Sequence, residues 1–188
     1  MSDPVSILNG ETFSGAVTVQ EAGLKGMITL RGDFADAKMA AALKSALGLA
    51  LPQTRQILTG AKGSVAWMSP DELLVMVAYD QVDTIVAKLE KSLAGLHALV
   101  VNVSDARAMF TLTGHGCREV IAKGAPADLS SHGLPVGEIR RSRVGQLAAA
   151  FWLSDSETLH VVCFRSVGTH MFLWLSNAAA SDTPPGFL

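Results

Sequence analysis

Apolar and polar positions follow the same order in two stretches of the chain. Residues 24–31 alternate in the manner of a half-buried strand, and a helix-forming run follows at 37–47. Met109–Gly114 opens a strand and a turn as Met27–Gly32 does, and a shorter helical run follows at 117–122. The pattern therefore predicts a strand followed by a helix in each half of the chain.

A longer pattern recurs further along each half. In residues 67–77 and 152–162, a tryptophan is followed by serine two residues on, glutamate at five, leucine at seven and valine at ten. Two apolar runs joined by the same polar turn are typical of a β-hairpin. Because the spacing repeats, the chain is predicted to contain a duplicated α+β unit.

Polar residues mark where the helices are expected to begin. Asp33 or Asp36 is able to cap the helix at 37–47, because a short acidic side chain accepts a hydrogen bond from an amide of the first turn. Asp80 and Ser166 are predicted to cap the helices that follow the two hairpins.

Strand, helix, hairpin and helix succeed one another in both halves. Each half is predicted to be a ferredoxin-like βαββα arrangement, with an antiparallel sheet and helices packed on one face. We expect an extended N-terminal arm at 1–22, a first α+β repeat at 23–100, a second α+β repeat at 101–180 and a polar tail at 181–188.

The composition is apolar, with 49% hydrophobic and 17% charged residues. We expect part of this excess to be covered by a partner protein, although a large internal core is the alternative. The formal net charge of −2 does not favour nucleic-acid binding. Arg140, Arg141 and Arg143 form a local basic cluster, interpreted as a solvated loop with an anion or partner site as the alternative.

Cys117 and Cys163 have neither metal-ligand nor redox spacing and are expected to be buried thiols. The chain has no run of about 18–20 apolar residues that would span a membrane, and its start is polar. Together these features predict a cytoplasmic protein.

Candidate catalytic residues are few. Gly114-His115-Gly116 joins a strand to a helix, which is compatible with anion binding at backbone amides or with a simple tight turn. His115 and His132 lie in predicted loops and are the candidate acid–base residues. His160 lies in an apolar strand, where a hydrogen-bonded structural histidine is expected. No histidine or cysteine spacing predicts a zinc site.

Two other groups of residues have alternative interpretations. Asp105 and Arg107 are expected to form an ion pair between the halves, or else to face a ligand. Trp67 and Trp152 occupy equivalent hairpin positions and are expected in the core. Trp174 lies on a final helix that is apolar nearly all round, which predicts deep burial or coverage by another subunit.

Several segments resemble the gamma subunit of heterotetrameric sarcosine oxidase. The first are Val103–Arg107 and the run Leu112–Leu129, in which Lys-Gly, Pro and Asp-Leu after the helix are the distinctive residues. The match continues through Trp67–Leu74 and from Phe164-Arg165-Ser166 into Leu173-Trp174-Leu175. It extends from about residue 20 to about residue 180.

This resemblance implies a fold related to the folate-binding aminomethyltransferase domain, the T-protein of glycine cleavage. In the family, a cytoplasmic complex of sarcosine catabolism and one-carbon metabolism oxidises sarcosine to glycine, with hydrogen peroxide and formaldehyde or methylene-tetrahydrofolate as further products. FAD, FMN, NAD, tetrahydrofolate and zinc are expected on the alpha, beta and delta partner subunits. The gamma subunit is regarded as a cofactor-free structural partner, so we assign no catalytic, cofactor-binding or metal residue here.

The alternative is a free-standing tetrahydrofolate-binding protein or one-carbon transferase of the same fold, and a third possibility is a scaffold unrelated to amine oxidation. Aminomethyltransferases carry an acid in an Asn-Asp-Val run after the helix equivalent to 117–122. Here the stretch reads Lys123-Gly124-Ala125-Pro126, with no carboxylate until Asp128, which argues against folate chemistry.

Overall fold

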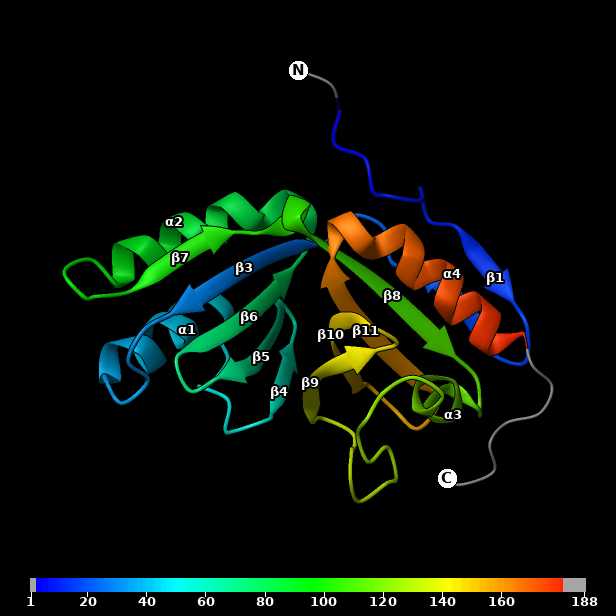
Figure 1. Cartoon of the computed structure of the whole chain (residues 1–188). Helices are drawn as coiled ribbons and strands as arrows, with labels where there is room; N and C mark the ends of the chain where they lie inside the picture. Colours follow the sequence, from blue (N-terminus) through cyan, green and yellow to red (C-terminus); the bar gives the residue numbers. More distant parts are fainter. Residues whose placement is uncertain (1–2, 181–188) are drawn as a thin grey trace. The chain divides into compact units, whose positions relative to one another are not determined.

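The computed structural model describes residues 3–180, and the chain divides into two compact units (Figure 1). One unit is Leu24–Asp105. The other consists of the described residues up to Gly23 and from Ala106 onward. Each unit contains one antiparallel sheet with its helices, so the predicted α+β class and the duplicated ferredoxin-like plan are confirmed.

The unit Leu24–Asp105 has a five-stranded sheet in the order β4-β5-β6-β3-β7. Its elements, in chain order, are β3 (Gly26–Arg31), α1 (Ala37–Leu47), β4 (Ile57–Gly60), β5 (Gly63–Ser69), β6 (Glu72–Val77), α2 (Val82–Ser92) and β7 (Leu99–Asn102). The buried side chains of α1 and α2 share one apolar core with one face of this sheet.

Helix α1 begins and ends at signals that the sequence contains. The Asp36 carboxylate accepts a hydrogen bond from the Lys38 amide at 2.8 Å, whereas Asp33 binds the Ala35 amide ahead of the helix. Gly48 has a φ of 77° and donates its amide to the Lys44 carbonyl, a conformation that glycine adopts without strain. Of the two candidate caps, Asp36 is therefore the N-cap.

The predicted caps Asp80 and Ser166 are wrong. Each lies inside a short 3₁₀ turn, Tyr79–Gln81 or Arg165–Val167, and the helix that follows has no side-chain cap. The chain makes one tighter turn between the hairpin and the helix, so the polar residue comes too early to reach the first amides of the helix.

The second unit has a six-stranded sheet in the order β1-β2-β8-β11-β10-β9. Its elements are β1 (Thr12–Ser14), β2 (Thr18–Glu21), β8 (Arg107–Thr113), α3 (Cys117–Ala122), β9 (Ile139–Val144), β10 (Leu147–Leu153), β11 (Thr158–Phe164) and α4 (Gly168–Ala179). Helices α3 and α4 contribute to a core in which the rings of Phe110 and Phe172 lie 6.2 Å apart.

The central strands of the two sheets correspond, but one of the equivalent strands comes from a different part of the sequence in each unit. Strand β3 corresponds to β8, and the hairpin β5–β6 corresponds to the hairpin β10–β11. Beside β3 lies β7, which follows α2, whereas beside β8 lies β2, which comes from the N-terminal arm. The strand of the second repeat that is equivalent to β7 is therefore β2, which precedes the first repeat in the sequence.

The expected domain limits differ from these units. The arm expected at 1–22 contributes two strands to the sheet of the second repeat, and the expected boundary after residue 100 lies inside β7. The expected polar tail at 181–188 lies outside the described residues.

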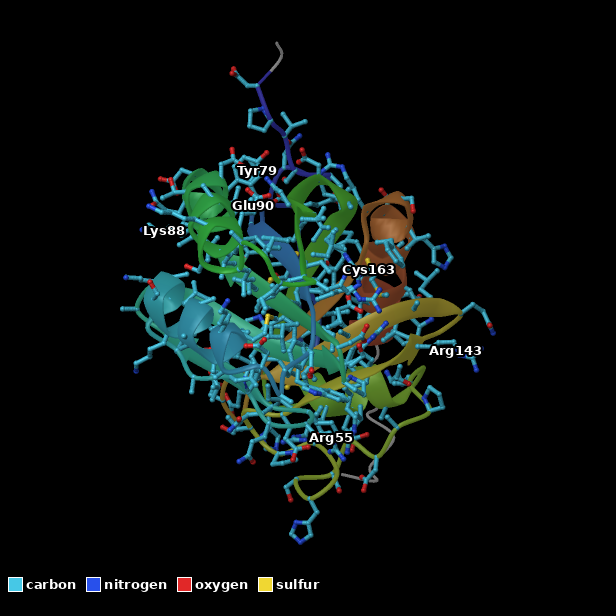
Figure 2. All side chains as sticks on the ribbon, turned by 90° about the vertical axis from the view of Figure 1, so that its left-hand side faces the viewer. Arg55, Tyr79, Lys88, Glu90, Arg143 and Cys163 are labelled. Carbon is cyan, nitrogen blue, oxygen red and sulfur yellow. The ribbon has the colours of Figure 1, made fainter. Side chains whose placement is uncertain are left out.

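Strand β9 was not predicted as a strand of its own, because its arginines resemble a solvated loop. The structure pairs it with β10, with Ile139 and Val144 buried and Arg141 and Arg143 exposed. Arg143 points away from the fold in Figure 2. An edge strand is held by main-chain hydrogen bonds and tolerates charged side chains, which explains the error.

Most apolar residues of the described chain lie inside the two units. Helix α4 buries Met171, Phe172 and Leu175 on one face, while Leu173 on the other face is 61% exposed, so deep burial holds for one face of this helix only. The large hydrophobic side chains that remain exposed among residues 3–180 are Val5, Leu99, Val101, Val136, Phe164 and Leu173.

Candidate functional site

The turn Gly114-His115-Gly116 joins β8 to α3. Gly114 has a φ of 136°, a backbone conformation that favours glycine. Its amide donates to the Glu157 carbonyl at 2.9 Å, and its carbonyl accepts from the Cys117 amide at 3.0 Å. The first bond joins the turn to the β10–β11 loop and the second closes the turn itself, so the Gly114 amide is engaged within the fold.

An open pocket of about 320 Å³ lies beside this turn. Its lining comes from the turn, from α3 and from the β10–β11 loop. The lining residues are His115, Arg118, Glu119, Ser156 and Glu157. Of the two histidines named as acid–base candidates, the structure places His115 here, whereas His132 is an exposed loop residue and does not line the pocket.

Arg118 is engaged with the loop between α3 and β9. Its Nη1 donates hydrogen bonds to the carbonyl oxygens of Leu129, Ser130 and Leu134 at 2.6, 3.2 and 2.9 Å. A single guanidinium nitrogen thus donates to three carbonyl oxygens of one loop and holds that loop against α3. Arg118 contributes a positive charge to the pocket, but its hydrogen bonds serve to hold the loop in place.

Of the other charged residues of the pocket, His115 and Glu157 are exposed, whereas Glu119 is buried. His115 Nδ1 lies 3.7 Å from Glu157 Oε1, and the two side chains are 101% and 57% exposed. The Glu157 amide donates to the Asp155 carboxylate at 2.9 Å, and this bond is the main cause that lowers the pKa of Asp155. The acidic side chain of Asp155 thereby stabilises the loop that carries Glu157.

The chemistry of the pocket is limited by these distances. General acid–base transfer needs groups within about 2.6–3.2 Å of the group with which they exchange a proton, whereas His115 Nδ1 lies 3.7 Å from Glu157 Oε1. Among the described residues, no group of three or more His, Cys, Asp or Glu side chains is placed to hold a metal ion. The pocket combines two carboxylates with a guanidinium and an imidazole, so its charges offset one another and do not select a ligand of one sign.

His160 forms a separate polar group on the β10–β11 hairpin. Its Nδ1 lies 3.2 Å from Thr111 Oγ1, its Nε2 lies 3.1 Å from Ser154 Oγ, and its ring centroid lies 5.2 Å from that of Trp152. Both ring nitrogens have partners, as expected for a structural histidine. The sequence did not identify these partners, because they meet only through the pairing of β8, β10 and β11.

The expected pair of Asp105 and Arg107 makes different contacts. Asp105 Oδ1 accepts a hydrogen bond from the Tyr79 hydroxyl at 3.4 Å, and it is the last residue of its unit. The Arg107 guanidinium lies 4.5 Å from the centroid of the Phe164 ring, on the neighbouring strand β11. Neither residue lines the pocket.

Both cysteines are buried free thiols, as expected. Burial raises the pKa of the Cys163 thiol to about 12, and it also raises the pKa of the Cys117 thiol. In Figure 2, Cys163 lies in the interior. Within residues 3–180, no helix combines the length and the hydropathy that crossing a membrane requires.

Comparison with known proteins decides the family. The family described as "Sarcosine oxidase, gamma subunit family" matches residues 31–181. The chain belongs to this family. A curated gamma subunit of sarcosine oxidase from Arthrobacter sp. is 26% identical over 174 residues, which cover 92% of this chain and 84% of that protein.

Solved structures agree with this gamma-subunit assignment at the level of fold. A chain of heterotetrameric sarcosine oxidase from Corynebacterium sp. U-96 superposes with a TM-score of 0.82 at 22% identity, covering 92% of this chain and 90% of that one. Aminomethyltransferase T of the glycine cleavage system from Bartonella henselae gives a TM-score of 0.61 at 16% identity, covering 82% and 44%. The expected relation to the aminomethyltransferase fold is confirmed.

The segment after α3, where the sequence was expected to differ from aminomethyltransferases, makes local structural contacts. Lys123 Nζ donates to the Ala178 carbonyl at 2.7 Å. Asp128 accepts the Ser130 amide at 2.9 Å, and hydrogen bonds from the Ser130 side chain and amide lower the pKa of Asp128. Asp128 therefore orders a turn, and neither residue lines the pocket.

Proposed function

We propose that this chain is a non-catalytic structural subunit of a flavin-dependent heterotetrameric sarcosine oxidase. The single observation that carries the proposal is the family match over residues 31–181. In this proposal the complex oxidises the N-methyl group of sarcosine with oxygen. The products are glycine, hydrogen peroxide and formaldehyde, or methylene-tetrahydrofolate where tetrahydrofolate accepts the one-carbon unit.

The proposal places the reacting groups on other chains. FAD, FMN, NAD, tetrahydrofolate and zinc would belong to the alpha, beta and delta partners, and the complex would work in the cytoplasm. Two features of this chain support a structural role. The His115 pocket is open to solvent, and its arginine is engaged with three loop carbonyls.

Co-expression with the three partner subunits tests the proposal. We expect the chain to co-elute with them on a sizing column as one complex that oxidises sarcosine. The double variant His115→Ala/Glu157→Ala is expected to leave the turnover number within about twofold, because neither residue acts in the reaction. A chain that elutes alone in the presence of all three partners would contradict the proposal.

The alternative function, free-standing folate binding, is favoured by the fold shared with aminomethyltransferase T. Calorimetric titration of the isolated chain with tetrahydrofolate separates the two. We expect no heat of binding at micromolar ligand, whereas a micromolar dissociation constant would support the alternative.

A further inference from the structure

The two sheets have four edge strands, and three of them carry features that discourage pairing. Strand β9 carries three arginines, β1 has three residues, and β4, which is four residues long like β7, ends in Gly60, a residue that weakens a strand. Strand β7 has the sequence Leu-Val-Val-Asn, without a charged side chain. Leu99 and Val101 lie on one face of it and are 49% and 38% exposed. An uncharged apolar edge of this kind is a template for another strand.

The other unit shows how the equivalent edge is covered. Strand β2 occupies the place of β7, and β1 pairs antiparallel with its outer side. Within residues 3–180, by contrast, no strand pairs with the outer side of β7. The same position in the duplicated fold is thus covered in one repeat and open in the other.

Strands β2 and β7 differ in their side chains, and the difference favours a partner strand beside β7. Thr29 and Thr111 are equivalent, and they lie opposite Val101 and Gln20. By the same register, Leu99 corresponds to Thr18, because their partners Arg31 and Thr113 are equivalent. The covered strand has polar residues at these two places, and the open strand has apolar ones.

Main-chain hydrogen bonds define which groups of β7 face outward. The Val103 amide donates to the Met27 carbonyl at 2.8 Å, and bonded pairs alternate along an antiparallel ladder. Leu99 and Val101 therefore direct their amides and carbonyls toward β3, whereas Val100 and Asn102 direct theirs outward. In the other unit, Glu21 corresponds to Asn102, and its outward amide donates to the Glu11 carbonyl at 2.9 Å.

We infer that the outer edge of β7 binds an extended segment of a larger partner subunit as an additional antiparallel strand. This inference rests on the proposed function, because it requires a hetero-oligomeric complex. The segment would bond to the amides and carbonyls of Val100 and Asn102 and cover Leu99 and Val101 with apolar side chains of its own.

A second copy of this chain fits the edge less well. A strand of four residues is only about 13 Å long, so two copies of β7 paired with each other would bury far less than the roughly 1,200–2,000 Å² of a stable interface. A larger subunit can extend its contact beyond the strand pair, for example onto α2, which neighbours β7. Lys88 and Glu90 project from this helix in Figure 2.

Amide hydrogen exchange on the assembled complex tests the inference directly. We expect the amides of Val100 and Asn102 to exchange at least tenfold more slowly in the complex than in the isolated chain. Those of Leu99 and Val101 should be protected in both, because they already face β3. Unchanged exchange at Val100 and Asn102 in an intact complex would overturn the inference and leave the proposed function standing.

Two variants test the same edge by assembly. Val100→Pro removes an outward donor without removing a bond to β3, and Leu99→Lys/Val101→Lys places charges on the exposed face. We expect each to raise the dissociation constant of the complex at least tenfold. Leu173→Lys, at an apolar residue of α4 that is 61% exposed, is the matched control and should leave assembly unchanged.

Three results would overturn the inference. The first is that the Lys pair assembles as well as Leu173→Lys does, with the fold of both confirmed by circular dichroism. The second is a concentration-dependent dimer of the isolated chain in which Val100 is protected, since the occupant would then be a second copy. The third is failure of the wild-type chain to assemble at all, which would also remove the proposed function.

Discussion

Trp174 depends on two glycines that face its indole. A Cβ placed on Gly124 would overlap the six-membered part of the ring, and one placed on Gly145 would lie 3.3 Å from its Nε1. The Gly145 amide also donates to the Gly124 carbonyl at 3.0 Å. The Lys-Gly pair after α3, noted as a distinctive motif, thus has a packing reason: only glycine leaves room for the indole.

Gly124→Ala is expected to destabilise the protein by about 1–3 kcal/mol, because the new methyl group must displace the Trp174 ring or the backbone. The free energy of unfolding in urea measures the effect. Gly116→Ala is the matched control, since its Cβ would meet only Val17 at 3.4 Å and its φ is −90°. Equal effects of the two substitutions would contradict the packing argument.

The buried Cys163 thiol makes the free energy of unfolding of the protein depend on pH in the alkaline range. Burial raises the pKa of its thiol from 9.0 to about 12, so between these values the folded chain keeps a proton that the unfolded chain loses. The stabilisation is complete below pH 9 and is lost as pH rises toward 12. We expect the free energy of unfolding to fall by about 1 kcal/mol by pH 10 from this thiol alone.

Comparison with Cys163→Ala isolates this contribution from those of lysine and tyrosine. The variant should lose less stability between pH 8 and pH 10 than the wild type does. Rapid reaction of both thiols with a disulfide reagent in the native protein at pH 8 would show that they are not shielded as the structure indicates.

The segment before β1 is attached to strand β2 by a buried carboxylate. Glu21 is 3% exposed, and its Oε2 accepts hydrogen bonds from Ser6 Oγ at 2.8 Å and from the Gly10 amide at 2.7 Å. The Arg165 guanidinium adds a bond to the Val5 carbonyl at 2.8 Å. The carboxylate therefore orders the chain as it enters the sheet.

Glu21→Ala is expected to cost roughly 2–4 kcal/mol, because two hydrogen bonds to a charged acceptor are lost and their donors remain partly buried. Proteolysis within residues 3–11 should become faster. Glu21→Gln, which keeps one acceptor oxygen, should have a smaller effect, and Glu11→Ala, at an exposed residue of the same segment, should have almost none. An unchanged proteolysis rate in Glu21→Ala would contradict the role assigned to this carboxylate.

Elements with a strong local pattern were predictable, and elements defined by their neighbours were not. The two hairpins and α1 were confirmed, because turn residues and apolar periodicity act over a few positions. Strand β9 was missed because its partner supplies the main-chain bonds. The hairpins also differ in register, since Trp67 lies opposite Leu73, whereas Trp152 lies opposite His160.

At the scale of the whole molecule, the duplication and the family were predictable, whereas the assignment of β2 to the second repeat was not. Its pairing with β8 joins residues such as Val19 and Leu112, and no local signal specifies a contact so distant in sequence. The candidate pocket shows the same limit. His115 was recognised from its turn, but Glu157 joins it only because β8 pairs with β11.

The place of β2 in the sheet also has a consequence for synthesis. Residues 18–21 leave the ribosome before the whole unit Leu24–Asp105, yet their neighbour β8 is translated only after that unit. Leu24–Asp105 is contiguous and can begin to fold while the nascent N-terminal strands wait without a partner. The other unit can close only after β8 has been synthesised, so we expect it to fold last.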